Sequence, residues 1–160
     1  MTVDDAGVIY VSDSSTGAVY RVDAAYEPSL LHRFEPSEAF TPNGLVFHPS
    51  GYLLIAGGES LYKVPLEDPA RASRVTLPEP VSGADGVVWT ADGRLAIVAY
   101  NANRVVALTS SNAWSSAELV GVAVYDEPAS TVAVVGDDLY VVYPHFEGDG
   151  VPSAELVRFQ

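Results

Sequence analysis

Cysteine is absent from the 160 residues, which excludes disulfides, thiolate zinc sites and cysteine nucleophiles. Basic residues are also scarce: 8 Lys and Arg stand against 21 Asp and Glu, a formal net charge of −13. Because so acidic a surface repels phosphate groups, we expect no nucleic acid and no membrane among the partners. The sequence shows no signal peptide and no apolar run long enough to cross a bilayer. We therefore expect a soluble protein whose compartment the sequence leaves unknown.

A sustained helical period is missing as well, and a repeat of short strands takes its place. Hydrophobic residues make up 48% of the chain, enough for one packed domain over residues 1–160. Four segments align on Gly7, Gly51, Gly93 and Gly136, which by subtraction of their numbers lie 44, 42 and 43 residues apart. This period is typical of propeller blades with four strands each. The sequence therefore predicts an all-β propeller of four antiparallel blades.

The predicted blades span approximately residues 1–35, 41–78, 83–124 and 129–160, the first and the last being incomplete. Each marker glycine predicts a hairpin turn that leads into the second strand of its blade. These second strands are expected at Val8–Ser12, Tyr52–Ala56, Arg94–Ala99 and Asp138–Tyr143. Third strands are expected at Ala18–Val22, Ser60–Pro65, Arg104–Thr109 and Ala154–Phe159, and fourth strands at Ser29–Phe34, Ser73–Leu77 and Glu118–Val124.

Neither end of the chain supplies a spare strand that would tie four blades into a closed ring. An arc with two unpaired edges exposes backbone donors and acceptors, which favours pairing with another chain. We therefore expect an arc of a larger, six-bladed ring, or a ring completed by association. The expected partners are a second copy of the chain or the missing blades.

Two polar residues occupy equivalent positions in neighbouring repeats. Asn43 lies eight residues before Gly51, and Asp85 lies eight before Gly93. Because the first strands of propeller blades line the central axis, these side chains are expected to converge there. An amide oxygen and a carboxylate suit a hard cation such as Ca²⁺. The alternative is that Asn-Gly and Asp-Gly are simply turn dipeptides, although each repeat already has its hairpin glycine.

The surrounding residues resemble the gluconolactonase and regucalcin-like family. Pro42-Asn43-Gly44-Leu45, followed by Pro49-Ser50-Gly51, is similar to the family's Pro-Asn-Gly-Leu…Pro-Asp-Gly stretch. In the next blade, Ala84-Asp85-Gly86, followed by Ala91-Asp92-Gly93-Arg94-Leu95 and Tyr100-Asn101, is similar to its Pro-Asp-Gly…Gly-Xaa-Leu…Tyr-Asn stretch. The chain departs from the pattern at Ser50 and Ala84. The resemblance maps residues 1–160 onto the last four blades of a six-bladed propeller.

This resemblance implies a lactone or ester hydrolase that uses a metal-oriented water. It implies that Asn43 is a metal ligand and that Asp85 is both a metal ligand and the catalytic base, with Ca²⁺ as the expected cofactor. The family uses two further ligands, a Glu from its first blade and an Asn-Asp motif that would fall just before Met1. We therefore expect weak metal affinity and little or no hydrolysis from residues 1–160 alone.

Three further residues are candidates for the pocket. His145 follows the second strand of the last repeat and has a side chain suited to a general base, though a lone histidine beside aromatics is more often structural. Tyr100 and Asn101 close a strand, where a turn role is the alternative to contact with a ligand. Residues 147–150 are interpreted as a solvated loop.

A second class of function stays open at this stage. A propeller fold hosts many unrelated functions, so the chain can also be a non-catalytic binding or assembly module, or an engineered fragment of a propeller. Calcium binding that depends on Asn43 would discriminate the enzyme from the module.

Overall fold

The computed structural model describes residues 1–35, 40–146 and 150–160 and contains four antiparallel sheets, one per predicted blade. The first sheet comprises β1 (Thr2–Val3), β2 (Ile9–Asp13), β3 (Ala18–Val22) and β4 (Pro28–Arg33), and the second β5 (Leu45–His48), β6 (Tyr52–Gly57), β7 (Ser60–Pro65) and β8 (Ser73–Arg74). The third comprises β9 (Ala84–Trp89), β10 (Leu95–Ala99), β11 (Arg104–Thr109) and β12 (Glu118–Val124), and the fourth β13 (Thr131–Val135), β14 (Asp138–Tyr143) and β15 (Ser153–Leu156). The predicted four-bladed propeller is confirmed.

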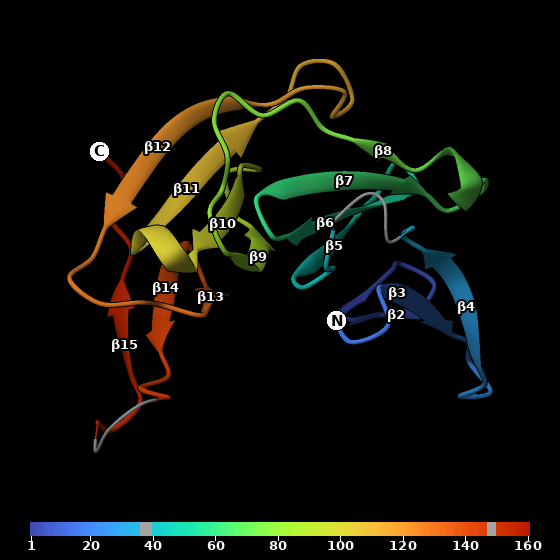
Figure 1. The fold of residues 1–160 in the computed structure, drawn as a ribbon, viewed down its shortest axis with the longest axis horizontal. Coiled ribbons are helices and arrows are strands. Elements are labelled where there is room, and N and C mark those ends of the chain that lie inside the picture. The colour runs from blue at the N-terminus through green and yellow to red at the C-terminus, as the bar shows by residue number, and fades with distance from the viewer. Residues whose placement is uncertain (36–39, 147–149) are drawn as a thin grey trace.

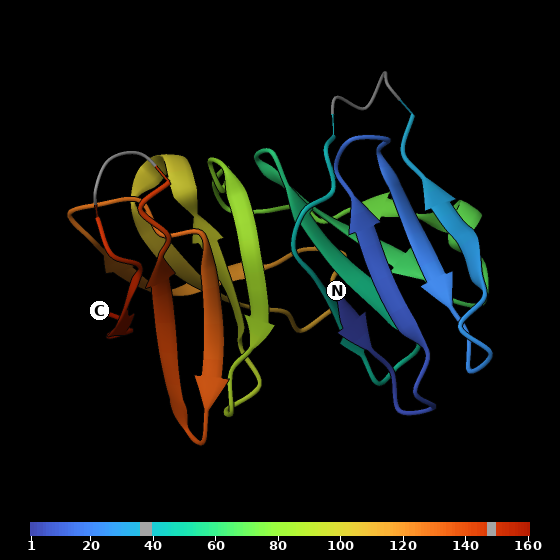
Figure 2. The same ribbon diagram turned by 90° about the horizontal axis from the view of Figure 1, so that it is seen from below.

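The blades follow one another around an arc (Figure 1). The first strand of each blade lies on the concave side, and the strands of a blade are ordered outwards as they occur in the chain. Figure 2 shows the blades side by side, with the turns that join β9 to β10 and β13 to β14 at the same end of their blades. Short 3₁₀ turns occur at η2 (Pro69–Arg71) and η3 (Tyr100–Ala102). Within the described residues, no helix is long and apolar enough to span a lipid bilayer.

The hairpin glycines have the backbone conformation that the repeat predicts. Gly51 and Gly93 both have φ +82°, and their N–H groups donate hydrogen bonds of 2.9 Å to the carbonyls of His48 and Thr90. A positive φ carries no steric cost at glycine, which has no Cβ. These turns fix the register of the first two strands in each blade.

Apolar clusters between consecutive blades form the core. Every residue of β6 and of β10 is buried, because the blades on either side cover both faces of these strands. One cluster lies between the first and second blades, a second between the second and third, and a third between the third and fourth. Trp114 is buried in the second cluster and meets Trp89 edge to face.

Predicted strand bounds differ from the structure where the chain leaves its own sheet. The strand predicted at Ser73–Leu77 ends at Arg74, because Thr76 forms a parallel bridge with Ser116 of the third blade. The strand predicted at Ala154–Phe159 is β15, Ser153–Leu156. Beyond it, the Gln160 N–H donates to the carbonyl of Val122 in β12, at 2.9 Å. Contacts to a neighbouring blade therefore override the local strand pattern.

Candidate functional site

Asn43, Asp85 and Ser130 occupy equivalent places at the inner strands of the second, third and fourth blades. The Gly44 N–H donates a hydrogen bond to the Asp85 carbonyl (3.1 Å), and the Gly86 N–H donates to the Ser130 carbonyl (3.0 Å). The same bond thus links consecutive blades twice, one residue after Asn43 and one residue after Asp85. We call these three residues the axial row, since β5, β9 and β13 lie on the concave side of the arc (Figure 1).

The first blade reaches the axial row through two serine hydroxyls. Ser12, in β2, donates from Oγ to the carbonyl of Asn43, and Ser14 donates to the carbonyl of Pro42 at 2.7 Å. The second blade holds the same segment, because the Asn43 N–H donates to the carbonyl of Ala56 at 2.8 Å. The backbone of Asn43 is therefore fixed from two blades, while its side chain stays exposed.

Glycine follows Asn43 and Asp85 because consecutive blades touch there. Neither Gly44 nor Gly86 has a positive φ. A Cβ on Gly44 would lie 2.1 Å from the Asp85 carbonyl oxygen, and a Cβ on Gly86 would lie 2.5 Å from the Cα of Thr131. The interpretation of Asn-Gly and Asp-Gly as turn dipeptides is therefore wrong. Close approach between backbones accounts for both glycines, and it places Asn43 beside Asp85.

Asp85 is the half-buried carboxylate of the axial row. Burial raises its pKa above the ordinary value, and a hydrogen bond from the Asn43 side chain opposes that rise. Of the described residues, no lysine or arginine contributes to the pKa of Asp85. A carboxylate with these properties can accept a proton or bind a cation. The bond from the Gly44 N–H to the Asp85 carbonyl thus brings the predicted pair close together, and its chemical role remains a prediction.

Two side chains of the axial row have oxygen atoms of the kind that calcium binds. Calcium takes about six to eight oxygen ligands, whereas Asn43 and Asp85 offer one amide and one carboxylate. Their backbone carbonyls already accept hydrogen bonds from the Ser12 hydroxyl and the Gly44 N–H. Over residues 1–35, 40–146 and 150–160, no group of three or more His, Asp and Glu side chains is arranged to hold a metal. The two side chains could supply two oxygen ligands to a hard cation, and this role remains a prediction.

His145 is held by the connection that enters the fourth blade. Its Nδ1 lies 3.3 Å from Oε2 of Glu127, and its ring lies 6.5 Å from that of Tyr143. The backbone of His145 is left-handed, with φ +49°, and a Cβ on Gly150 would lie 2.7 Å from its ring. These contacts give His145 a structural setting. Residues 147–149 of the predicted neighbouring loop lie outside the described residues.

Tyr100 and Asn101 lie in η3, against the segment that leads into β9. The Tyr100 N–H donates to the Gly83 carbonyl (3.1 Å), and the Asn101 N–H donates to the Ser82 carbonyl (3.2 Å). A Cβ on Gly83 would lie 2.8 Å from the Asn101 side chain. Both residues therefore support the backbone two and three residues before Asp85, and contact with a ligand remains a prediction.

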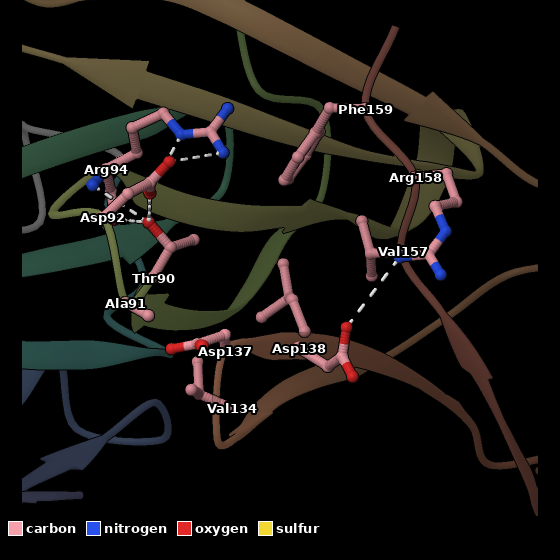
Figure 3. Close-up of a pocket in the computed structure, with 11 residues that line it drawn as sticks. Thr90, Ala91, Asp92, Arg94, Val134, Asp137, Asp138, Val157, Arg158 and Phe159 are labelled. Atoms are coloured by element: carbon pink, nitrogen blue, oxygen red, sulfur yellow. Dashed lines mark hydrogen bonds and ion pairs between the residues drawn. The ribbon is translucent and has the colours of Figure 1, made fainter.

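A hollow of about 510 Å³ lies elsewhere, between the third and fourth blades (Figure 3). Its lining joins the hairpin after β9 to the hairpin after β13 and includes Val134, Leu139 and Val157 as apolar side chains. Because Asp85 lies at the start of β9 and Thr90 follows its end, the hollow is roughly 16 Å along the strand from the axial row. Sequence reasoning did not identify this hollow, because residues from two separate repeats form it.

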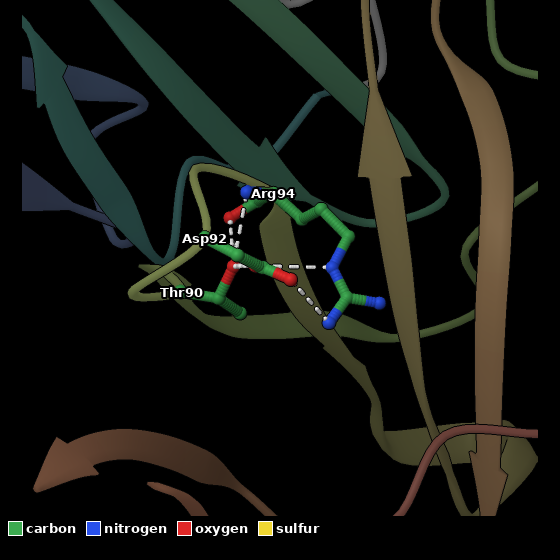
Figure 4. Close-up of polar contacts among 3 residues, drawn as sticks. All are labelled: Thr90, Asp92 and Arg94. Carbon is green, nitrogen blue, oxygen red and sulfur yellow. Dashed lines mark hydrogen bonds and ion pairs between the residues drawn. The ribbon is translucent and has the colours of Figure 1, made fainter. Parts of the chain in front are cut away.

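Three polar residues of the lining, Thr90, Asp92 and Arg94, contact one another (Figure 4). Asp92 accepts hydrogen bonds from the Thr90 hydroxyl (2.6 Å) and from Nε of Arg94 (3.0 Å), and Nη2 of Arg94 lies 2.8 Å from its second oxygen. The hydrogen bond from Arg94, followed by that from Thr90, lowers the pKa of Asp92 to about 2. The Arg94 guanidinium lies 5.2 Å from the ring centre of Phe159. The charges of Asp92 and Arg94 therefore neutralise one another, and their contacts stabilise the hairpin between β9 and β10.

No protein-family model and no curated protein matches the sequence. Solved structures match the fold. A protein classed provisionally as a gluconolactonase has a TM-score of 0.73 at 14% identity, over 98% of this chain and 58% of its own. The allergen Mala s 1 of Malassezia sympodialis has a TM-score of 0.73 at 21% identity, over 99% of this chain and 54% of its own. A streptogramin B lyase has a TM-score of 0.68 at 14% identity, over 88% and 46%.

These likenesses concern the fold alone, which is that of the six-bladed propellers. The chain spans about half the length of the structures that it matches. Propellers of this fold include enzymes of the lactonase and lyase kinds.

Proposed function

We propose that the chain is part of a lactonase-type hydrolase in which Asp85 accepts a proton from water. Asp85 and Asn43 together would bind a divalent cation, for which Ca²⁺ is the first candidate. The substrate would be a lactone or an ester. One observation carries the proposal: Asp85 is half-buried, and Asn43, at the equivalent place in the preceding blade, lies beside it and opposes the rise of its pKa.

A bound cation would polarise the substrate carbonyl and lower the pKa of water. The residues of the chain would do the rest. Because burial raises its pKa, the Asp85 carboxylate is a stronger base than an exposed aspartate. The Asn43 amide would orient that carboxylate, and the bonds from Gly44 and Gly86 to the neighbouring blades would hold the row rigid.

Calcium titration of residues 1–160 by calorimetry tests the proposed cation site. We expect weak, saturable binding that is lost in Asn43→Ala and in Asp85→Asn. The matched control is Asp137→Asn, which removes one exposed carboxylate from the opposite end of the blades. Binding that survives in both axial variants would contradict the proposal, because it would place the cation elsewhere on the acidic surface.

Lactone hydrolysis by the chain alone is expected to be weak or absent, because Asn43 and Asp85 are two ligands out of a larger set. Activity with Ca²⁺ that is abolished by Asp85→Asn would correct this expectation and support the role of Asp85. Activity that Asp85→Asn leaves unchanged would contradict the assignment of the base.

A non-catalytic assembly module is the second candidate, and exposed apolar side chains in the first and fourth blades, such as Val3, Leu30 and Val135, favour it. Absence of any calcium binding that depends on Asn43 would favour the module over the enzyme.

A further inference from the structure

A second hollow, of about 360 Å³, lies between one end of the second blade and the loop that follows β11 in the third blade. We call it the Lys63 hollow. Both of these blades have all four of their strands, and each is flanked by a neighbouring blade on either side. The polar side chains that line the hollow are Ser50, Lys63, Glu67, Arg71, Ser73 and Ser115.

Lys63 is held at the junction of the two blades by three contacts. It pairs with Leu54, which belongs to the apolar cluster between the second and third blades, so the lysine lies on the face that turns toward the third blade. Its ammonium lies 4.3 Å from the ring centre of Tyr52 and donates a 2.6 Å hydrogen bond to the Ala113 carbonyl. An ammonium has three donors, so Lys63 is fixed in direction and still has N–H groups for a ligand.

The repeat itself does not require a charge at this place. Lys63 is the only lysine of the chain, and it pairs with the third residue after its hairpin glycine. The equivalent residue of the first blade, Arg21, is exposed, and that of the third blade, Ala107, is fully buried. A neutral residue therefore satisfies the packing of a blade, and the charge of Lys63 is available for another purpose.

Arg71 contributes a second cation to the Lys63 hollow, from η2. Among the described residues, no carboxylate oxygen lies within 4.0 Å of the charged nitrogens of Lys63 or Arg71, whereas other arginines of the chain form such pairs. Glu67 also lines the hollow, so its charged side chains are two positive and one negative. The hollow is therefore locally positive in a chain whose formal net charge is −13.

Three serine hydroxyls complete the set of donors around the hollow. In the described part of the chain, none of these hydroxyls has a hydrogen-bond partner. A hydroxyl can rotate to donate to whatever acceptor is nearest. The serines concerned are Ser50, in the hairpin before β6, Ser73, in β8, and Ser115, in the loop after β11.

From this donor set we infer that the Lys63 hollow binds a phosphate group, either as inorganic phosphate or as part of a small phosphate monoester. A phosphate monoester carries roughly −1.5 to −2 charges at pH 7 and three strong acceptor oxygens. Arginine binds phosphate through two parallel hydrogen bonds, and lysine binds it as a point charge. A carboxylate has one charge and two oxygens, so it would use fewer of these donors.

The size and the position of the hollow agree with a small ligand that is separate from the axial row. A volume of about 360 Å³ is near the lower end of the range of about 300–1,000 Å³ for ligand pockets. The strand β5 leads from Asn43 to the hairpin that contains Ser50, so the two places lie roughly 15 Å apart along the strand. The inference is therefore independent of the proposed cation and of any hydrolysis.

Calorimetric titration at constant ionic strength tests the inference, with inorganic phosphate, glycerol 3-phosphate, glycerol and acetate as separate probes. We expect saturable binding of both phosphate compounds and none of glycerol or acetate. Tighter binding of glycerol 3-phosphate than of inorganic phosphate would identify a monoester as the ligand, and equal affinities would identify the phosphate group alone. A wild type that binds neither phosphate compound, or binds acetate equally well, would overturn the inference.

Three variants locate the binding site. Arg71→Gln removes an exposed guanidinium, and Lys63→Met removes the ammonium but keeps a long side chain against Tyr52. The matched control is Arg21→Gln, which removes one exposed cation at the equivalent place of the first blade. Circular dichroism checks that all three variants fold.

We expect Arg71→Gln and Lys63→Met each to weaken phosphate binding at least about tenfold, and Arg21→Gln to leave it unchanged. Because Lys63 also supports the loop at Ala113, the exposed Arg71 gives the decisive comparison. Arg71→Lys, which keeps the charge without the two parallel bonds, should retain part of the affinity. Arg71→Gln that binds phosphate as tightly as the wild type would overturn the inference, and so would an equal loss in Arg21→Gln.

Discussion

The two ends of β9 hold aspartates in opposite settings. Asp85, at the start of the strand, is half-buried. Burial raises its pKa, and only the neutral amide of Asn43 opposes that rise. Asp92, just beyond the other end, is exposed and has its pKa lowered to about 2 by Arg94 and Thr90. The carboxylate of Asp85 is therefore harder to ionise than usual, and that of Asp92 is already paired with Arg94.

This difference shows why the hollow beside Asp92 and the candidate site at Asp85 do not coincide. The hollow beside Asp92 owes its shape to the junction of two hairpins, and its charges are paired within the chain. The axial row owes its position to close contact between backbones, and its carboxylate lacks a cationic partner among the described residues. A half-buried carboxylate with a raised pKa and no cationic partner is a stronger indication of chemistry than volume is.

The variants Gly86→Ala and Gly93→Ala compare the backbone next to Asp85 with the backbone next to Asp92. At Gly86 a Cβ would lie 2.5 Å from the Thr131 Cα, so we expect a loss of about 2–3 kcal/mol in the free energy of unfolding. At Gly93 the Cβ has open space and only the positive φ is strained, which costs about 1 kcal/mol. Urea unfolding of both variants measures the difference. Equal losses would mean that the blades are not closely packed along the axial row.

The repeat made the fold predictable, because hairpin glycines and strands recur at one spacing. The third strands of the first three blades begin and end where the sequence predicted. The same register identified Asn43 and Asp85 as neighbours. The signal for the close approach was also present, since Gly44 and Gly86 each lie seven residues before a hairpin glycine.

Contacts between blades were beyond sequence reasoning, because they join residues that no local pattern relates. Ser130 has no motif that marks it as a member of the axial row, and Trp114 looks like a loop residue until the second cluster surrounds it. The interaction of Arg94 with Phe159 joins residues of two different repeats. In each case the position follows from how one blade packs on the next.

Arg94→Ala tests whether the ion pair between Asp92 and Arg94 stabilises the fold. We expect a loss of about 0.5–1 kcal/mol at neutral pH, from the ion pair and from packing on Phe159. Because the folded pKa of Asp92 is lowered to about 2, the stabilisation by the pair is present above its ordinary pKa and disappears as the pH falls through about 2. Thermal unfolding of both proteins at pH 7 and at pH 2 measures this. A difference that is as large at pH 2 would assign the whole effect to packing.

Asp85→Asn should have the smallest effect on stability, and the opposite sign. Since burial raises the pKa of Asp85, its ionised form costs free energy once the pH exceeds the ordinary value of 3.8. The wild type therefore loses stability through this group as the pH rises through that region, and the neutral variant does not. Allowing for the partial exposure of Asp85, we expect the variant to be more stable at pH 7 by at most about 0.5 kcal/mol, or a rise of about 1–2 °C in Tm.

At pH 3, where both the folded and the unfolded wild type bind the proton, the two Tm values should converge. A variant that is less stable at pH 7 than at pH 3, relative to the wild type, would mean that the fold stabilises the charged carboxylate, and the contrast between the two ends of β9 would then be lost.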